Sequence, residues 1–334
     1  MASTTPQADL VILMPVYNDW ECVPPLLDDI DATLAARPGT RVRVLLADDG
    51  SDRREFALPS KSAFKAIRSV EVLRLRRNLG HERAIAVGLA WIHQERPSDA
   101  VLIMDADGED RPNDIPALLE RWESERRVPV VFAARARRLE GATFRLFYRL
   151  FQLLHVFLVG AMVRVGHFSL VPRAQLSKLV AVSELWNHYA ASVQKARLPR
   201  VLVPLDRGRR IAGKSTMNFV SLVIHGLSAI SVFADTVGVR ILFASSGLGA
   251  ITLALIAAVI VLRLATDLVI PGWATYATGL LLLLLAQCAI ASFMAVLFIL
   301  TTRNNLSFLP LRDFRHFVES VEEIRPLATP PSTA

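Results

Sequence analysis

Cysteine is scarce in this sequence, which contains only Cys22 and Cys288. With one of the two inside a long apolar run, a disulfide framework and a cysteine-ligated zinc site are excluded. The first residues also lack the basic segment of a secretory signal peptide, so we expect the large N-terminal domain to stay in the cytoplasm. There is no Gly-x-Gly-x-x-Gly, which excludes a dinucleotide-binding fingerprint.

Charged residues are missing from two long stretches, residues 241–262 and 273–302. About 20 apolar residues cross a bilayer, so each stretch predicts a transmembrane helix, and the short segment between them indicates a hairpin. Arginines such as Arg240 and Arg303 flank its outer ends, which by the positive-inside rule places both termini in the cytoplasm. We therefore expect a multi-pass protein of the inner (cytoplasmic) membrane.

The net charge is +7, from 38 basic and 31 acidic residues. Most of the basic residues are arginine, whose planar fork suits phosphate, and a basic surface beside a membrane suits anionic headgroups. Nucleic acid is the alternative partner for a basic chain. The membrane segments argue against it, so we expect a lipid bilayer and no nucleic acid as partner.

The first 135 residues alternate short apolar runs with helical stretches. Nearly continuous apolar runs are typical of parallel strands buried on both faces, and the alternation predicts a doubly wound, Rossmann-like α/β sheet with ligands beyond the carboxyl ends of its strands. Strands are expected over 10–15, 42–47, 70–75, 100–104 and 128–133, and helices over 20–36, 81–96 and 113–127. Segments 144–158 and 219–236 carry a thin polar seam on a wide apolar face, which favours helices in the membrane interface over helices packed on the core.

Acidic residues follow two of these strands, in Asp48-Asp49-Gly50-Ser51 and in Asp105-Ala106-Asp107-Gly108-Glu109-Asp110. Carboxylates at such positions suit Mg²⁺ or Mn²⁺ bridging a diphosphate. Acidic turns that are simply solvated are the alternative for either motif alone. Two acidic strand ends in one sheet favour a metal and phosphate site.

Four motifs, Pro15-Val16-Tyr17-Asn18, Asp48-Asp49-Gly50-Ser51, Arg77-Asn78-Leu79-Gly80 and the DxD motif Asp105-Ala106-Asp107, occur in the order seen in family 2 glycosyltransferases. The chain resembles this family, in particular its polyprenyl-phosphate glycosyltransferases, the dolichyl-phosphate mannose synthase and GtrB-like group. The resemblance implies a GT-A domain over 1–218, an interfacial amphipathic helix over 219–239, a two-helix transmembrane hairpin over 240–302 and a cytoplasmic tail over 303–334.

The resemblance also implies an activity, namely a membrane-anchored inverting enzyme of cell-envelope glycan biosynthesis. It would move one sugar from a nucleotide-sugar to polyprenyl (undecaprenyl or dolichyl) phosphate, with a UDP-sugar favoured as donor and GDP-mannose as the alternative. A phosphate nucleophile is already ionised near neutral pH, so no strong general base is required. A homo-oligomer is compatible with the sequence, which does not set the number of subunits.

By resemblance, the site residues fall into four groups. Donor binding is assigned to Pro15, Tyr17, Asn18, Asp48, Asp49, Arg77 and Asn78. Catalysis is assigned to Asp105, Asp107 and Asp110, and metal binding (Mg²⁺ or Mn²⁺) to Asp107 and Glu109. The acceptor phosphate is assigned to Arg135, Arg210, Lys214 and Ser215, across the cleft from the nucleotide.

Three other functions compete with this one. Residues 208–215 satisfy the P-loop pattern GxxxxGK[ST], but an interfacial helix follows where an NTPase needs further sheet and a Walker-B acid. Residues 194–198 partly match the QxxRW of processive polysaccharide synthases but lack the Trp. A non-catalytic membrane-tethered scaffold is the third.

The chain departs from the family motif at residues 164–169. Relatives often carry Asp-x-Gly-Asp-Phe-Arg there, whereas this chain has Arg-Val-Gly-His-Phe-Ser, with His167 in place of the second Asp. This departure leaves the donor sugar and the role of His167 open.

Overall fold

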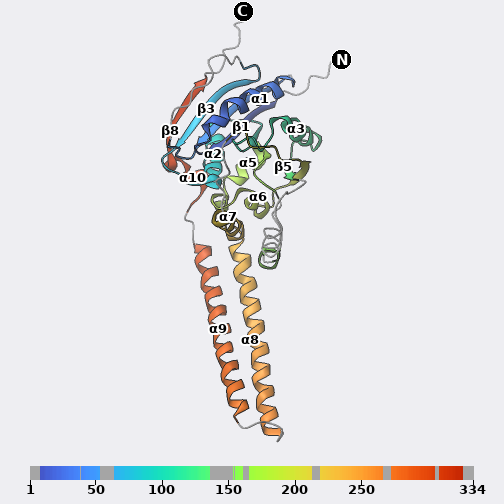
Figure 1. Ribbon diagram of the computed structural model, residues 1–334, viewed down its shortest axis with the longest axis vertical. Helices are drawn as coiled ribbons and strands as arrows, with labels where there is room; N and C mark the ends of the chain where they lie inside the picture. Colours follow the sequence, from blue (N-terminus) through green and yellow to red (C-terminus); the bar gives the residue numbers. More distant parts are fainter. Residues whose placement is uncertain are drawn as a thin grey trace, which may run out of the picture. The chain divides into compact units, whose positions relative to one another are not determined.

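The computed structural model describes residues 8–37, 39–52, 64–135, 153, 155–160, 165–212, 219–265, 272–304 and 308–325. The chain divides into two compact units. One contains the sheet with α1, α2, α3, α5, α6, α7 and α10, and the other contains the two long helices α8 and α9 (Figure 1). The functional motifs of the sequence lie in the first unit.

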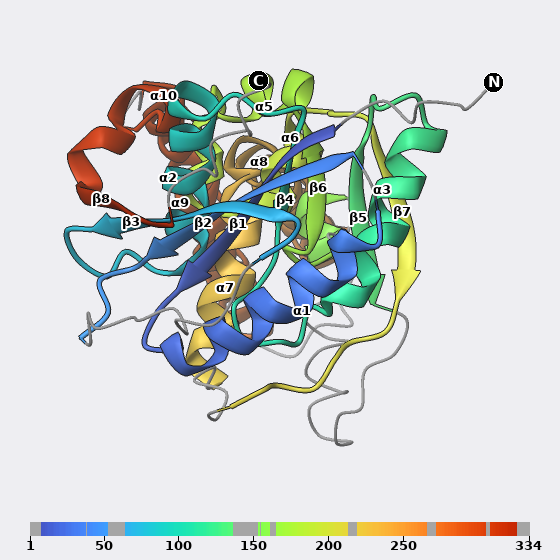
Figure 2. The same cartoon turned by 90° about the horizontal axis from the view of Figure 1, so that it is seen from above.

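A mixed eight-stranded sheet forms from the described residues, with strand order β7-β5-β6-β4-β1-β2-β3-β8 (Figure 2). The strands are β1 (Ala8–Val16), β2 (Thr40–Asp48), β3 (Ile67–Leu75), β4 (Ala100–Ile103), β5 (Val130–Arg135), β6 (Ser169–Pro172), β7 (Arg200–Leu205) and β8 (Val318–Arg325). The five strands expected from the apolar runs are all present. β1 to β4 pair in parallel, in the order β3-β2-β1-β4.

Helices cover both faces of this sheet. They are α1 (Val23–Ala35), α2 (His81–Glu95), α3 (Ile115–Ser124), α5 (Arg173–Leu179), α6 (Tyr189–Lys195), α7 (Phe219–Ser231) and α10 (Pro310–Asp313). Alternate strand residues point to opposite faces, so Ile12 packs with α1 and α3 while Leu13 packs with α2 and α5. The layers leave the carboxyl ends of β1, β2 and β4 at one edge of the sheet, where Tyr17, Asp48 and Asp105 lie.

Two strands differ from the expectation of a simple parallel sheet. β6 enters between β4 and β5 and pairs antiparallel with both. β8 pairs antiparallel with β3, so residues 318–325 of the tail expected over 303–334 form a strand of the sheet, in the same unit as the domain expected over 1–218. The residues of β8, VESVEEIR, form an edge strand whose pairing comes from the tertiary fold and not from an apolar run.

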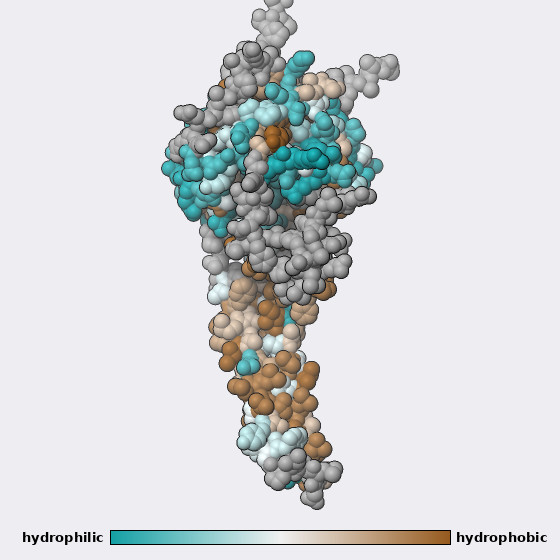
Figure 3. All heavy atoms as spheres, viewed as in Figure 1, coloured by the Kyte–Doolittle hydropathy of each residue, from teal (hydrophilic) through white to brown (hydrophobic). Residues whose placement is uncertain are grey.

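The second unit contains α8 (Ala234–Ala265) and α9 (Trp273–Asn304), packed against each other. Both are long and apolar enough to cross a membrane by length and composition, and each contains an 18-residue stretch with a mean hydropathy of 2.5. Their outward side chains are mostly apolar (Figure 3), whereas Ser245 and Ser292 hydrogen-bond between them at 2.8 Å. An apolar surface with polar side chains turned inward is the pattern of a membrane hairpin.

The expected boundaries around this hairpin shift. The interfacial helix expected over 219–239 ends at Ser231, and α8 begins at Ala234, because Asp235 stabilises the first turn of α8 instead of continuing the polar seam of α7. Of the second expected interfacial segment, 144–158, most residues lie outside the described residues, and 155–159 are helical.

Candidate active site

Asp48, the last residue of β2, and Asp49, which follows it, are both buried and both accept hydrogen bonds from neighbouring segments. Asp48, 2% exposed, accepts a hydrogen bond from the backbone N–H of Ser51 at 3.0 Å and one from the guanidinium of Arg74 at 3.0 Å. Asp49 accepts from the backbone N–H groups of Leu79 at 2.7 Å and Gly80 at 2.9 Å. Burial raises the pKa of Asp49, and these two N–H groups oppose that shift. Asp49 thus positions the Arg77–Gly80 loop, whereas Asp48 holds the turn at Ser51 and the side chain of Arg74. The direct role of both acids in donor binding stays a prediction.

Gly50 stands between these acids and the Arg77-Asn78 segment. Its backbone has φ +72°, and a Cβ added there would lie 2.6 Å from Arg77 C and from Asn78 N. Only glycine permits both this conformation and this approach. The side chains of Arg77 and Asn78 are exposed at this edge.

The segment after β1 reaches the same edge. Pro15 is buried within β1, whereas Tyr17, which follows the strand, is 44% exposed. Asn18 adopts φ 59° and its side-chain amide pairs with Asp52, donating at 3.1 Å and accepting from the Asp52 N–H at 3.0 Å. An exposed aromatic ring beside a fixed loop is suited to stacking on a base.

The DxD motif lies directly beyond β4 and is braced by its own loop. Asp110, 5% exposed, accepts from the backbone N–H of Asp105 at 2.9 Å, and Asp107 accepts from the N–H of Glu109 at 2.9 Å. Burial, and then the charge of Asp105, raise the pKa of Asp107, while Arg210 lowers it. Asp105, Asp107 and Glu109 therefore share one tight turn.

A second loop, residues 206–212 after β7, lies on the DxD loop. The backbone N–H groups of Gly208 and Ile211 donate to the carbonyls of Glu109 at 2.8 Å and Asp107 at 2.9 Å. A Cβ on Gly208 would lie 2.8 Å from the carbonyl oxygen of Gly108, so the two backbones approach as closely as glycine allows. The loops form one structural element of the site.

Two arginines of this second loop pair with the acids of the first. Arg210 donates to Asp107 at 3.2 Å and to Asp19 at 2.9 Å, and Arg207 forms an ion pair with Glu109. The pairing of β7 with β5 brings this loop onto the end of β4, so Arg210 lies at the DxD loop, and its assignment to the acceptor phosphate stays a prediction. Arg207 and Asp19 were not anticipated from the sequence, although Arg207 belongs to the basic run 207–210.

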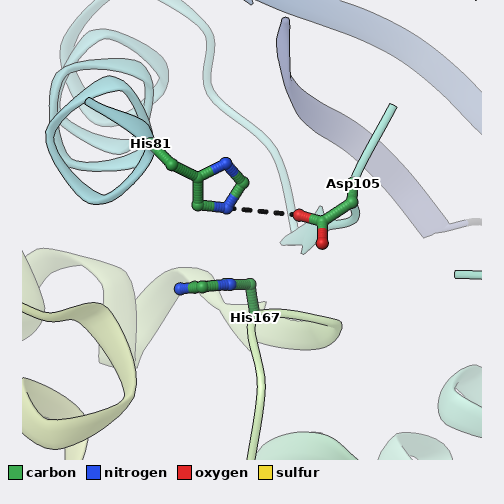
Figure 4. Close-up of side chains that lie close together, drawn as sticks. All are labelled: His81, Asp105 and His167. Carbon is green, nitrogen blue, oxygen red and sulfur yellow. Dashed lines mark ion pairs between the residues drawn. The ribbon is translucent and has the colours of Figure 1, made fainter. Parts of the chain in front are cut away.

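Histidines converge on the other side of the DxD motif. His81, the first residue of α2, places Nε2 3.2 Å from Oδ1 of Asp105, and its ring centroid lies 4.6 Å from that of His167 (Figure 4). Burial lowers the pKa of His81, but the carboxylate of Asp105 outweighs that and raises it to about 9. His167 itself hydrogen-bonds Glu82 at 2.8 Å. The sequence places His81 and Glu82 directly after the Arg77–Gly80 motif, the one signal that could have marked them.

Three of the residues assigned to the acceptor phosphate lie partly or wholly outside the described residues. Arg135 ends β5, and only its backbone is described. Lys214 and Ser215 lie outside the described residues. Their assignment to the acceptor phosphate therefore stays a prediction.

The donor set of the DxD loop fits a hard divalent cation. Its carboxylates come from Asp105, Asp107 and Glu109, and oxygen ligands of this kind suit Mg²⁺ or Mn²⁺. Two of the three are already paired with guanidinium groups, those of Arg210 and Arg207, so the turn attracts positive charge.

The family model for glycosyl transferase family 2 matches residues 11–180. The chain belongs to glycosyl transferase family 2. Its sheet unit is accordingly a GT-A domain, and the motifs described above lie within the matched range except for the loop 206–212.

Several family 2 relatives are similar over parts of the chain. The undecaprenyl-phosphate 4-deoxy-4-formamido-L-arabinose transferase of Pectobacterium atrosepticum is 35% identical over 111 residues, 33% of this chain and 32% of that protein. The transferase of the same name from Pseudomonas aeruginosa (strain LESB58) is 36% identical over 135 residues, which are 40% of this chain and 38% of that protein. The match thus spans about a third of the length of these relatives. The uncharacterized glycosyltransferase YkcC of Bacillus subtilis is 25% identical over 281 residues, which cover 79% of this chain and 80% of that protein.

Two solved structures are also similar. The mannosyltransferase PcManGT from Pyrobaculum calidifontis, in complex with GDP-Man and Mn²⁺, has a TM-score of 0.41 at 14% identity, covering 91% of this chain and 88% of that one. Glucosyl-3-phosphoglycerate synthase from Mycobacterium tuberculosis, in complex with Mn²⁺, UDP-glucose and phosphoglyceric acid, has a TM-score of 0.47 at 14% identity, covering 69% and 80%.

Proposed function

We propose that this family 2 member is a membrane-anchored inverting glycosyltransferase that moves one sugar from a nucleotide-sugar to a polyprenyl phosphate. The observation that carries the proposal is the contact of the DxD loop with the arginine-bearing loop 206–212 at the carboxyl ends of the strands. One loop offers carboxylates for a diphosphate-bound metal, and the other offers cations for phosphate. Two helices of membrane length, and relatives named undecaprenyl-phosphate transferases, support a lipid acceptor.

On the donor side, Tyr17 would stack on the base and the Arg77-Asn78 segment would face the diphosphate. Asp105, Asp107 and Glu109 would hold Mg²⁺ or Mn²⁺, which supplies neutralisation of the leaving diphosphate. Because Arg210 already pairs with Asp107, the cation and the arginine would share that carboxylate or exchange on it. Asp110 accepts the Asp105 N–H, so we assign it to positioning the DxD turn rather than to proton transfer.

On the acceptor side, a phosphate oxygen of the lipid attacks the anomeric carbon while the bond to the nucleoside diphosphate breaks on the opposite face. One displacement inverts the configuration. The nucleophile is ionised near neutral pH, since the second pKa of a phosphate monoester is about 6. The main tasks of the site are then to orient the acceptor phosphate and to neutralise its charge, and we assign them to the cations of Arg207, Arg210 and Lys214.

The test is transfer by the purified full chain in lipid nanodiscs containing undecaprenyl or dolichyl phosphate, with a panel of labelled nucleotide-sugars. We expect one of them to give a lipid carrying a single sugar of inverted anomeric configuration. Asp107→Asn should abolish transfer, whereas Asp29→Asn, an exposed change on α1, should leave it intact. Absence of labelled lipid with every nucleotide-sugar would contradict the proposal, and a growing glycan would instead indicate a processive synthase.

A further inference from the structure

Three histidines from separate segments surround one carboxylate oxygen in the GT-A domain. Oε1 of Glu82, in the first turn of α2, lies 2.8 Å from Nε2 of His167, 3.5 Å from Nδ1 of His225 and 3.6 Å from Nδ1 of His188. The other oxygen, Oε2, accepts the backbone N–H of Tyr189 at 2.7 Å. That hydrogen bond fixes the carboxylate and aims Oε1 at the imidazoles.

The spacings of Glu82, His188 and His225 are those of ligand atoms around a metal ion, and the 2.8 Å contact of His167 is a hydrogen bond to Glu82 that a metal bond would replace. With bonds of about 2.0–2.1 Å, the ligand atoms of a tetrahedral zinc site stand about 3.3 Å apart. The three distances from Oε1 bracket that value. The nitrogens of His188 and His225 and the carboxylate oxygen all lie within 4.8 Å of one another. The side chains of Glu82 and His167 are 13% exposed and that of His188 is 5% exposed, so most of the cluster is shielded from bulk water.

The chemistry of the four groups selects a cation. An anion would meet the carboxylate of Glu82, whereas a metal ion satisfies the carboxylate and the imidazole lone pairs together. Imidazole suits zinc, copper, nickel or iron, and hard ions such as Mg²⁺ prefer oxygen. Nδ1 of His188 also faces the N–H of Ala191, but at 3.4 Å, a long contact that a metal bond would replace.

We propose that Glu82, His167, His188 and His225 form a binding site for a borderline divalent metal such as Zn²⁺, distinct from the DxD site. His81 separates the two, because its Nε2 faces Asp105 while its ring packs edge-on against His167 (Figure 4). The metal would link α2, the segment before β6, the start of α6 and α7. It would fasten α7, the helix that precedes the membrane hairpin, to the catalytic domain. This proposal does not depend on the transferase activity.

The test is a Co²⁺ titration of the metal-stripped full chain in detergent, with excess Mg²⁺ present to occupy the DxD site. Four-coordinate Co²⁺ absorbs visible light far more strongly than six-coordinate Co²⁺. We expect about one equivalent of strongly absorbing Co²⁺, displaced by Zn²⁺. Since even an outer-shell change costs roughly 10- to 100-fold in metal affinity, loss of a ligand in His188→Ala or His225→Ala should weaken binding further.

Matched controls separate this site from others. His316→Ala, an exposed histidine outside the cluster, and Asp107→Asn should both keep the absorption. His225 is 35% exposed, so His225→Ala tests the site even if His188→Ala fails to fold. The proposal is overturned if the wild-type chain gives no strong absorption, if the Asp107→Asn variant loses it, or if the folded His225→Ala variant binds Co²⁺ as tightly as wild type.

Discussion

Arg74 joins the C-terminal strand to the donor side of the sheet, and we expect Arg74→Met to destabilise the GT-A domain strongly. Its guanidinium, 9% exposed, donates to Asp48 and, through two hydrogen bonds of 2.9 and 3.0 Å, to Glu322 of β8. Removing one partner of a buried ion pair costs about 3–5 kcal/mol. The Glu322 side chain is 52% exposed and Asp48 keeps the Ser51 N–H, so the lower end applies.

A loss of about 3 kcal/mol corresponds to a fall in Tm of roughly 6–12 °C for a domain of this size. The assay is thermal unfolding of the full chain in detergent, followed by intrinsic fluorescence. Arg76→Met, an exposed neighbour, should change stability by less than about 0.5 kcal/mol. In the double variant with Asp48→Asn, part of the loss should be recovered, since no charge is then left buried alone. Equal falls in Tm for Arg74→Met and Arg76→Met would refute the buried pair and the docking of β8.

Three further outcomes test the site and the topology. Gly50→Ala should keep the fold but weaken nucleotide-sugar binding. The left-handed backbone costs a residue with a Cβ about 1–2 kcal/mol, and the new methyl group displaces the Arg77-Asn78 backbone. Gly247→Ala, with open space around it, should leave both the fold and nucleotide-sugar binding unchanged. Chelation should abolish transfer and added Mg²⁺ or Mn²⁺ restore it, and full activity in excess EDTA would exclude the metal assignment. A cysteine at Asp267 should react with an impermeant reagent from outside the cell, whereas tags at both termini should be reachable only from the cytoplasm.

Local pattern alone determined much of this protein. The apolar runs from Leu10 to Ala133 predicted five strands within a few residues, because a strand buried on both faces must be apolar at nearly every position. The two long stretches without charged residues predicted α8 and α9, since a helix that crosses a bilayer needs about 20 consecutive apolar residues. The acidic motifs that contain Asp49 and Asp107 were recognisable because acids at the carboxyl ends of parallel strands fall at one edge of the sheet.

Only the tertiary structure decided which distant side chains meet. β8 has only three apolar residues, Val318, Val321 and Ile324, spaced three apart instead of alternating as in a strand, so its place beside β3 follows from the fold and from Arg74. Arg210 reaches Asp107 because β7 pairs with β5, a contact across more than a hundred residues of sequence. The histidines around Glu82 are likewise scattered along the chain. Their convergence depends on how α2, α6 and α7 pack, and packing is a property of the whole domain rather than of any local pattern.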